Sequence, residues 1–164
     1  MNNYPFLYPD ELMPKRQKKV FSYRRFSSGS QAGGSSLERQ EKIFQKVFKE
    51  KYEPQGYRFD GSFVDKGVSS FRGKNVSKGN LGRIIELAKK GSRIREGDLI
   101  AIESLDRFSR DNPIKSLRRL FGIVIDLGIK IDFLDKEWIP ALDRDNFEKV
   151  LHEIFNECQR SHYE

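Results

Sequence analysis

The stretch FSYRRFSSGSQAGGSSLERQ, residues 21–40, determines how the fold begins. Residues 20–26 are β-prone and lead into a loop rich in glycine and serine. Ser35-Ser36-Leu37-Glu38 has the Ser-x-x-Glu spacing of a capping box, whose side chains satisfy the free N–H groups of a helix start. We therefore predict a strand over 20–26, a polar loop and a helix over 36–52.

The same alternation of strand and helix patterns continues along the chain. Strands are predicted over 57–64, 99–102 and 129–134, and apolar residues at helical spacing occur near 81–88, 117–124 and 145–163. This order predicts an α/β fold of three αβα layers, in which helices cover both faces of a mostly parallel sheet of four to five strands. Ligand sites of such sheets lie beyond the carboxyl ends of the strands, so chemistry is expected there.

The composition is that of a globular domain. Of 164 residues, 37% are hydrophobic, enough for one packed core, and the net charge of +7 favours a polyanionic partner. The single cysteine, Cys158, excludes an internal disulfide, and no apolar stretch is long enough to cross a bilayer or act as a signal peptide. We expect a cytoplasmic protein with no membrane partner, in which 1–19 form a basic, flexible arm and 20–164 the folded domain.

Arginines recur at the predicted carboxyl ends of three strands. Arg25 and Ser27 are two positions apart, so their side chains point the same way along a strand. Arginine's planar fork donates paired hydrogen bonds to phosphate oxygens, which predicts an anion site made of Arg25, Arg72, Arg107 and Arg110. The alternative is that these arginines form ordinary surface salt bridges with neighbouring aspartates.

The kind of chemistry at the strand ends is narrowed by excluding other kinds of site. Both histidines, His152 and His162, lie in the predicted last helix, far along the chain from the strand ends, so a Ser-His-Asp arrangement is not expected. The strand ends are richer in arginine than in acid, which argues against a metal site, and no phosphate-binding glycine motif follows the first strand. We predict that Ser27 attacks an anionic phosphate without metal, nucleotide or other cofactor.

Three motifs follow one another along the chain. The first is Tyr23-Arg24-Arg25-Phe26-Ser27-Ser28, with the later Gln31 and Gln40. The second is Asp65-Lys66-Gly67-Val68-Ser69, and the third is Leu105-Asp106-Arg107-Phe108-Ser109-Arg110. In sequence and order they resemble the first motif, the Asp-x-Gly-x-Ser segment and the Leu-Asp-Arg-Leu-x-Arg signature of the serine recombinases, the resolvase and invertase family. The resemblance covers about 20–164.

The resemblance implies a catalytic domain that cuts and rejoins double-stranded DNA through a 5′-phosphoserine on Ser27. It implies that Arg25, Arg107 and Arg110 bind the scissile phosphate, with either Arg72 or Lys78 as the basic residue of the second motif. The supporting residues would be Gln31, Gln40, Asp65, Ser69 and Asp106. Further DNA contacts are expected from Arg24, Lys74 and Lys78.

The resemblance also sets expectations about partners. Members form dimers that pair into tetramers, so a homodimer or homotetramer is expected, with a role in recombination or integration of transposon or phage DNA. The family's DNA-binding domain is expected to be absent, because the chain stops at Glu164. Two alternatives stay open: a catalytically idle dimerisation or regulatory module, and a metal-free phosphodiesterase or phosphotransferase.

Overall fold

The computed structural model describes residues 16–26, 33–66, 80–91, 93–103, 118–135 and 140–163. The strands are β1 (Lys19–Phe26), β2 (Arg58–Lys66), β3 (Leu99–Ile102) and β4 (Lys130–Phe133), and the α-helices are α1 (Gly33–Val47), α3 (Asn80–Lys90) and α6 (Phe147–Tyr163). Short π- or 3-10-helical segments are η1 (Phe48–Tyr52), η2 (Glu53–Gln55) and η3 (Gly122–Asp126). Within these residues no helix is both long and apolar enough to cross a membrane.

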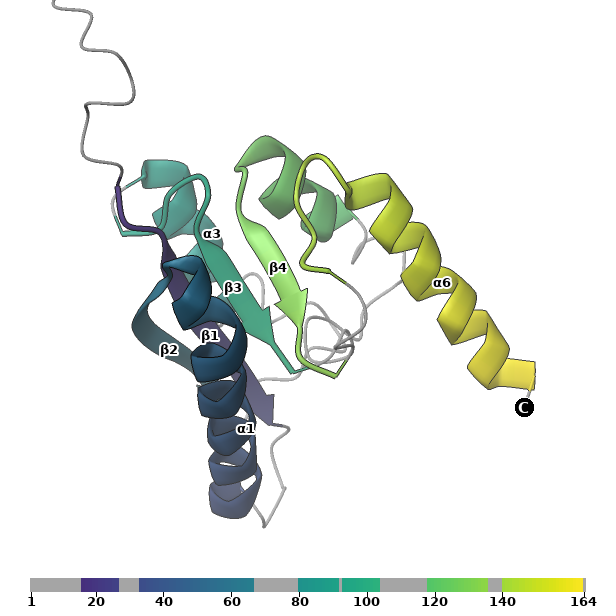
Figure 1. The fold of residues 1–164 in the computed structure, drawn as a ribbon, viewed down its shortest axis with the longest axis horizontal. Helices are drawn as coiled ribbons and strands as arrows, with labels where there is room; N and C mark the ends of the chain where they lie inside the picture. The colour runs from purple at the N-terminus through teal and green to yellow at the C-terminus, as the bar shows by residue number, and fades with distance from the viewer. Residues whose placement is uncertain are drawn as a thin grey trace, which may run out of the picture.

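The strands form one parallel sheet in the order β2-β1-β3-β4 (Figure 1). β1 is central and pairs with β2 over its whole length and with β3 from Val20 to Tyr23. An isolated antiparallel bridge joins Leu142 to Ile131 beside β4. The predicted α/β fold is confirmed, with four strands in the described part of the chain.

Side chains of β1 alternate between two buried layers. Val20 packs with Phe44 of α1 and Tyr52 of η1 on one face, whereas Phe21 and Tyr23 belong to the cluster on the other face. That second layer is built from α3, the helix that runs through η3, and α6, which contribute Ile84, Val124 and Ile154. In Figure 1, α1 lies in front of β1, and α6 lies on the flank beyond β4. The two layers give the predicted αβα arrangement.

The start of α1 differs from the prediction. The helix begins at Gly33, so Ser35 and Glu38 lie inside it and the predicted capping box is wrong. Glycine is conformationally permissive and can adopt helical angles, so Gly33 and Gly34 do not prevent the helix from starting before the motif. At the other end, α1 gives way at Val47 to η1 and η2, and Gly56 follows in a left-handed conformation with φ of 88°. The chain therefore turns into β2 one residue later than predicted.

Reciprocal hydrogen bonds fix the start of α6. The Asp143 carboxylate accepts hydrogen bonds from the backbone N–H groups of Asp145, at 2.9 Å, and Asn146, at 2.8 Å. The Asn146 side-chain oxygen accepts one from the Asp143 N–H at 2.9 Å. These bonds satisfy donors that a helix start leaves free, and the helix begins at Phe147 rather than at the predicted 145.

The last residues of the predicted N-terminal arm belong to the folded domain. Arg16 donates two hydrogen bonds of 2.8 Å to the two carboxylate oxygens of Asp98, which is completely buried. The backbone N–H groups of Lys19 and Arg95 donate to the same carboxylate at 3.0 and 2.9 Å. The described chain is thus attached to the domain from Arg16 onward, and residues 1–15 lie outside the described part.

Candidate active site at the carboxyl edge of the sheet

The three segments that carry the recombinase-like motifs leave the sheet at the same edge. β1 and β2 end side by side, with Arg25 opposite Asp65 and Phe26 opposite Lys66. β3 ends at Ile102, which pairs with Tyr23 of β1. Since all three strands are parallel, the chain after each of them continues from the carboxyl edge. This is the place predicted for the chemistry.

Most of the predicted site residues lie outside the described part of the chain. These are Ser27, Gln31, Ser69, Arg72, Lys74, Lys78, Asp106, Arg107 and Arg110. Arg25 and Asp65 are placed by their backbone as neighbours on adjacent strands. Their roles stay predictions, and the described edge consists of the strand ends, α1 and residue Glu103.

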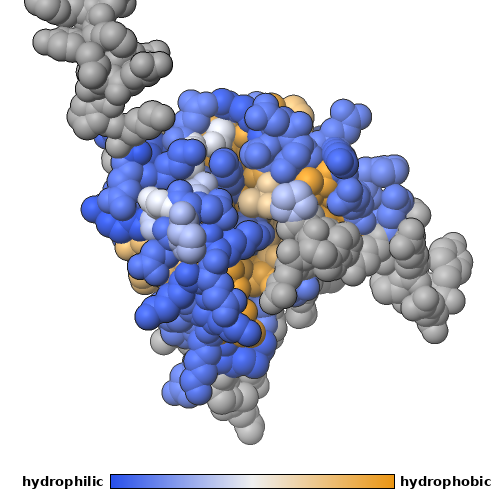
Figure 2. Space-filling view, in the orientation of Figure 1, coloured by the Kyte–Doolittle hydropathy of each residue, from blue (hydrophilic) through white to orange (hydrophobic). Residues whose placement is uncertain are grey.

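Gln40 of α1 is the predicted supporting residue whose side chain is described. It is 2% exposed and lies one helical turn before Phe44, which packs with Val20 of β1. The outer surface of α1 is hydrophilic (Figure 2). Gln40 lines a small hollow together with Arg24, Glu103 and the β1 residue Ser22. The helix thus brings this amide to the carboxyl edge.

Arg24 is directed into the protein. Its guanidinium forms an ion pair with Glu41 of α1 and donates hydrogen bonds to the hydroxyls of Ser62, at 2.6 Å, and Ser22, at 3.3 Å. The side chain is 12% exposed, and burial lowers the pKa of its guanidinium. Nε of Arg24 is buried and has no hydrogen-bond partner within the described residues. The Arg24 side chain is thus bound to Glu41 and Ser62, and its contact with DNA stays a prediction.

A second ion pair lies on the other side of Gln40. Arg39 of α1 contacts the carboxylate of Glu103 at 2.7 Å, and the Glu103 side chain is 15% exposed. The sequence analysis did not predict the ion pairs that Arg39, Glu41 and Glu103 form at this edge. Their pairing depends on the position of α1 on the sheet, which no local sequence pattern predicts.

The two ion pairs at this edge balance each other's charge. Arg24 is matched by Glu41 and Arg39 by Glu103, so two positive and two negative charges sum to zero. A phosphate would gain no net attraction from these four side chains. Attraction for DNA would have to come from other basic residues, such as Arg25 at the end of β1 and the arginines and lysines of the segments that follow the strands.

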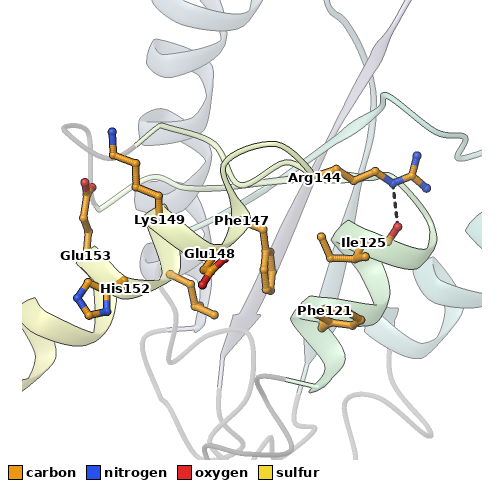
Figure 3. A pocket seen from close by; sticks show the side chains of 9 residues that line it. Phe121, Ile125, Arg144, Phe147, Glu148, Lys149, His152 and Glu153 are labelled. Atoms are coloured by element: carbon orange, nitrogen blue, oxygen red, sulfur yellow. Dashed lines mark hydrogen bonds between the residues drawn. The ribbon is translucent and has the colours of Figure 1, made fainter.

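A separate groove lies between α6 and the helix that contains η3 (Figure 3). The rings of Phe121 and Phe147 meet edge to face at 5.8 Å, and Ile125 and Leu151 extend the apolar lining. Arg144 donates a 2.8 Å hydrogen bond to the backbone oxygen of Ile125 at one end. Both helices belong to the layer opposite α1, so this groove is not part of the candidate site.

Comparison with known proteins identifies the family. The family model described as "Resolvase, N terminal domain" matches residues 20–163. The "Uncharacterized protein YbcK" of Escherichia coli (strain K12) is 31% identical over 127 residues, 77% of this chain and 24% of that protein, so the chain spans about a quarter of this relative.

Two solved structures are similar in fold. A resolvase family site-specific recombinase from Streptococcus pneumoniae is 22% identical, with a TM-score of 0.54 over 89% of this chain and 93% of that one. The N-terminal catalytic domain of TP901-1 integrase is 19% identical, with a TM-score of 0.60 over 90% of this chain and 100% of that one. Because the family model extends from β1 through α6, the chain belongs to the resolvase family, and residues 20–163 form its N-terminal domain.

Proposed function

We propose that this chain is the catalytic domain of a site-specific DNA recombinase, with Ser27 as its nucleophile. The observation that carries the proposal is the family match over 20–163. The sheet supports it, because the segments with the three motifs all leave the carboxyl edge and Arg25 lies opposite Asp65 there. The partner would be double-stranded DNA, bound by a dimer or tetramer of the chain.

The proposed reaction is two transesterifications in sequence. The Ser27 hydroxyl loses its proton and attacks a backbone phosphorus, and the bond from phosphorus to the 3′ oxygen breaks. The 3′ oxygen leaves as a hydroxyl after taking up a proton, while the 5′ end stays on Ser27 as a phosphoserine. A 3′ hydroxyl later attacks that phosphorus and releases Ser27. Bonds formed and broken are of the same kind, so the chemistry consumes neither water nor a nucleotide.

Arginines would supply the electrostatic part of this reaction. Negative charge builds on the non-bridging phosphate oxygens as Ser27 attacks, and guanidinium groups stay charged at any working pH. In the proposal, Arg25, Arg107 and Arg110 contact these oxygens, and Arg72 takes the second-motif position for which Lys78 competes. Gln31, Gln40, Asp65, Ser69 and Asp106 hold these groups in place.

Trapping the covalent intermediate tests the proposal. The chain is incubated in EDTA with DNA duplexes of random sequence, each nicked and labelled at the 3′ ends, and the products are separated under denaturing conditions. The label should migrate with the protein, because the fragment attached through its 5′ end keeps its 3′ label. Ser27→Ala should abolish the adduct, whereas the adjacent Ser28→Ala should retain it.

Three results would contradict the proposal. An adduct that persists in Ser27→Ala would place the nucleophile elsewhere. An adduct that forms only when metal is supplied and disappears in EDTA would indicate a metal-dependent enzyme. Finally, absence of any adduct with the parent chain, although DNA is bound, would favour a catalytically idle regulatory module.

A further inference from the structure

Three consecutive residues of α1, Arg39, Gln40 and Glu41, contact the sheet or the residue that follows it. Successive side chains are about 100° apart around an α-helix. Gln40 is buried against the sheet, so Arg39 and Glu41 lie on its two flanks and point to opposite sides. Each flank forms an ion pair with the sheet.

The two ion pairs span three adjacent strands. Glu41 binds Arg24 on β1, and the same guanidinium donates a 2.6 Å hydrogen bond to Ser62 on β2. Arg39 binds Glu103, which directly follows β3. The sheet order places β1 between β2 and β3, so α1 is held from both sides of the central strand. We name the pairs Arg24–Glu41 and Arg39–Glu103 the α1 clamp.

The Arg24–Glu41 pair of the clamp connects the two elements that flank the segment with the proposed nucleophile. Arg24 lies near the end of β1, just before Ser27, and Glu41 lies on α1, which begins directly after residue 32. An ion pair between them fixes the end of the strand relative to the middle of the helix, because Glu41 is the ninth residue of α1. Solvent reaches the two partners unequally, because the Arg24 side chain is 12% exposed and the Glu41 side chain is 36% exposed.

We propose that Arg24 and Glu41 are positioning residues of the active site, which set the place of Ser27 by holding α1 against the end of β1. This inference rests on the proposed function of Ser27. Arg24 then acts through Glu41 and does not touch DNA. The Arg24–Glu41 contact would thus orient Ser27, although neither residue belongs to the arginines proposed to bind the phosphate.

The test compares Arg24→Ala and Glu41→Gln with the parent chain. The rate of the Ser27 adduct is measured in single turnovers at saturating DNA, and the dissociation constant for the same duplex is measured separately. Both variants should lower the rate about 10–100-fold, because small displacements of reacting groups cost that much. The dissociation constant should stay within about twofold, since neither residue contacts DNA in this proposal.

A charge-reversed pair and a remote pair provide the matched controls. The double variant Arg24→Glu/Glu41→Arg restores an ion pair, and the carboxylate at position 24 can accept a hydrogen bond from the Ser62 hydroxyl, so it should recover most of the lost rate. Arg144→Ala breaks the ion pair with Glu96, which precedes β3 at the other end of that strand, and should leave the rate unchanged. Melting temperatures of all variants show whether a lower rate follows from unfolding.

Opposite effects on DNA affinity would overturn the inference. If Arg24 contacts DNA, Arg24→Ala weakens binding, whereas Glu41→Gln frees the guanidinium and strengthens it. Rates within about twofold of the parent in both variants would also overturn it. A parent chain that forms no adduct would refute the proposed function instead. In that case hydrogen exchange still tests the clamp: exchange over residues 24–41 should rise in Arg24→Ala relative to Arg144→Ala, and equal exchange would refute the clamp.

Discussion

Tyr52 of η1 donates a 2.5 Å hydrogen bond to the carboxylate of Asp132 on β4, and Lys51 donates a second one at 2.9 Å. Asp132 is 2% exposed and lies on the face of the sheet that α1 covers. Burial, and then the charge of Asp132, raise the pKa of the Tyr52 hydroxyl, so the phenol remains a donor. The π-helical turn after α1 is thus joined to the far strand of the sheet through a buried polar contact.

Tyr52→Phe should lower the free energy of unfolding by about 1–3 kcal/mol, because it removes a donor from a buried carboxylate and keeps the ring. Urea unfolding at neutral pH measures this change. Tyr57→Phe is the matched control, since the Tyr57 ring packs edge to face on Tyr52 at 6.3 Å in the same cluster. Equal losses in the two variants would show that the contact with Asp132 adds nothing.

The contact between Arg16 and Asp98 predicts a sharp difference between two truncations. A chain that starts at Arg16 should keep the parent's free energy of unfolding, whereas a chain that starts at Gln17 loses both bonds to Asp98. That loss should cost about 1.5–3 kcal/mol, the range for hydrogen bonds to charged groups. Thermal or urea unfolding of the two chains checks the prediction. A loss already present in the longer chain would mean that residues 1–15 also stabilise the fold.

The ion pairs of Asp60 predict that part of the free energy of unfolding is lost in acid. Its carboxylate lies 3.5 Å from Lys19, 3.3 Å from Arg58 and 3.4 Å from Arg93. Burial alone would raise the pKa of Asp60, but the charge of Lys19 and the contact with Arg93 lower it below 3.8. A carboxyl whose pKa is lowered by folding stabilises the native state above its unfolded pKa, and this contribution is lost as the pH falls through the folded pKa.

Asp60→Asn should therefore destabilise the protein by up to about 1 kcal/mol at neutral pH, and the difference from the parent should shrink below about pH 4. Urea unfolding of both proteins across this range measures it. Glu53→Gln, at an exposed position of η2, serves as the control for removal of a negative charge. A difference that does not change with pH would contradict the assigned role of Asp60.

Local sequence patterns predicted the strands well. The short apolar run at residues 99–102, which follows Gly97-Asp98, predicts a strand. The structure has β3 at Leu99–Ile102, with all four residues buried. The pattern at 20–26 likewise gave β1 to within one residue. Such runs report burial on both faces of a sheet, which is a local property of the chain.

Long-range relationships could not be predicted in this way. Between Val20 and Phe21 the pairing of β1 with β2 shifts by one residue, so Asp60 is an extra residue on β2, and Gly61 beside it has φ of 137°. The partners of Arg24 likewise depend on the register of β2 and the placement of α1. An arginine next to a predicted nucleophile therefore favoured a DNA contact, although its side chain turns to Glu41.

The basic residue of the second motif can be assigned by mutation. Under the proposed chemistry, Arg72→Ala should lower the rate of Ser27 adduct formation by about 10²-fold or more, because a guanidinium that contacts the phosphate stabilises the transition state. Lys78→Ala should affect mainly DNA affinity, since a lysine that contacts only the backbone contributes to binding. Single-turnover rates and dissociation constants separate the two effects. The reverse pattern would assign the position to Lys78.

The proposed chemistry predicts that both Arg107 and Arg110 are needed for rapid adduct formation. Alanine at either position should lower the rate of adduct formation by at least about 10²-fold at saturating DNA, because each removes positive charge from the attacked phosphate. Lysine at the same positions should restore little, since an ammonium group lacks the planar fork that holds two phosphate oxygens. Arg118→Ala, at an exposed residue of the helix that leads into η3, should leave the rate unchanged. If alanine variants of Arg107 and Arg110 retain rates within about threefold of the parent, these arginines do not stabilise the transition state, and the phosphate must be bound by other residues.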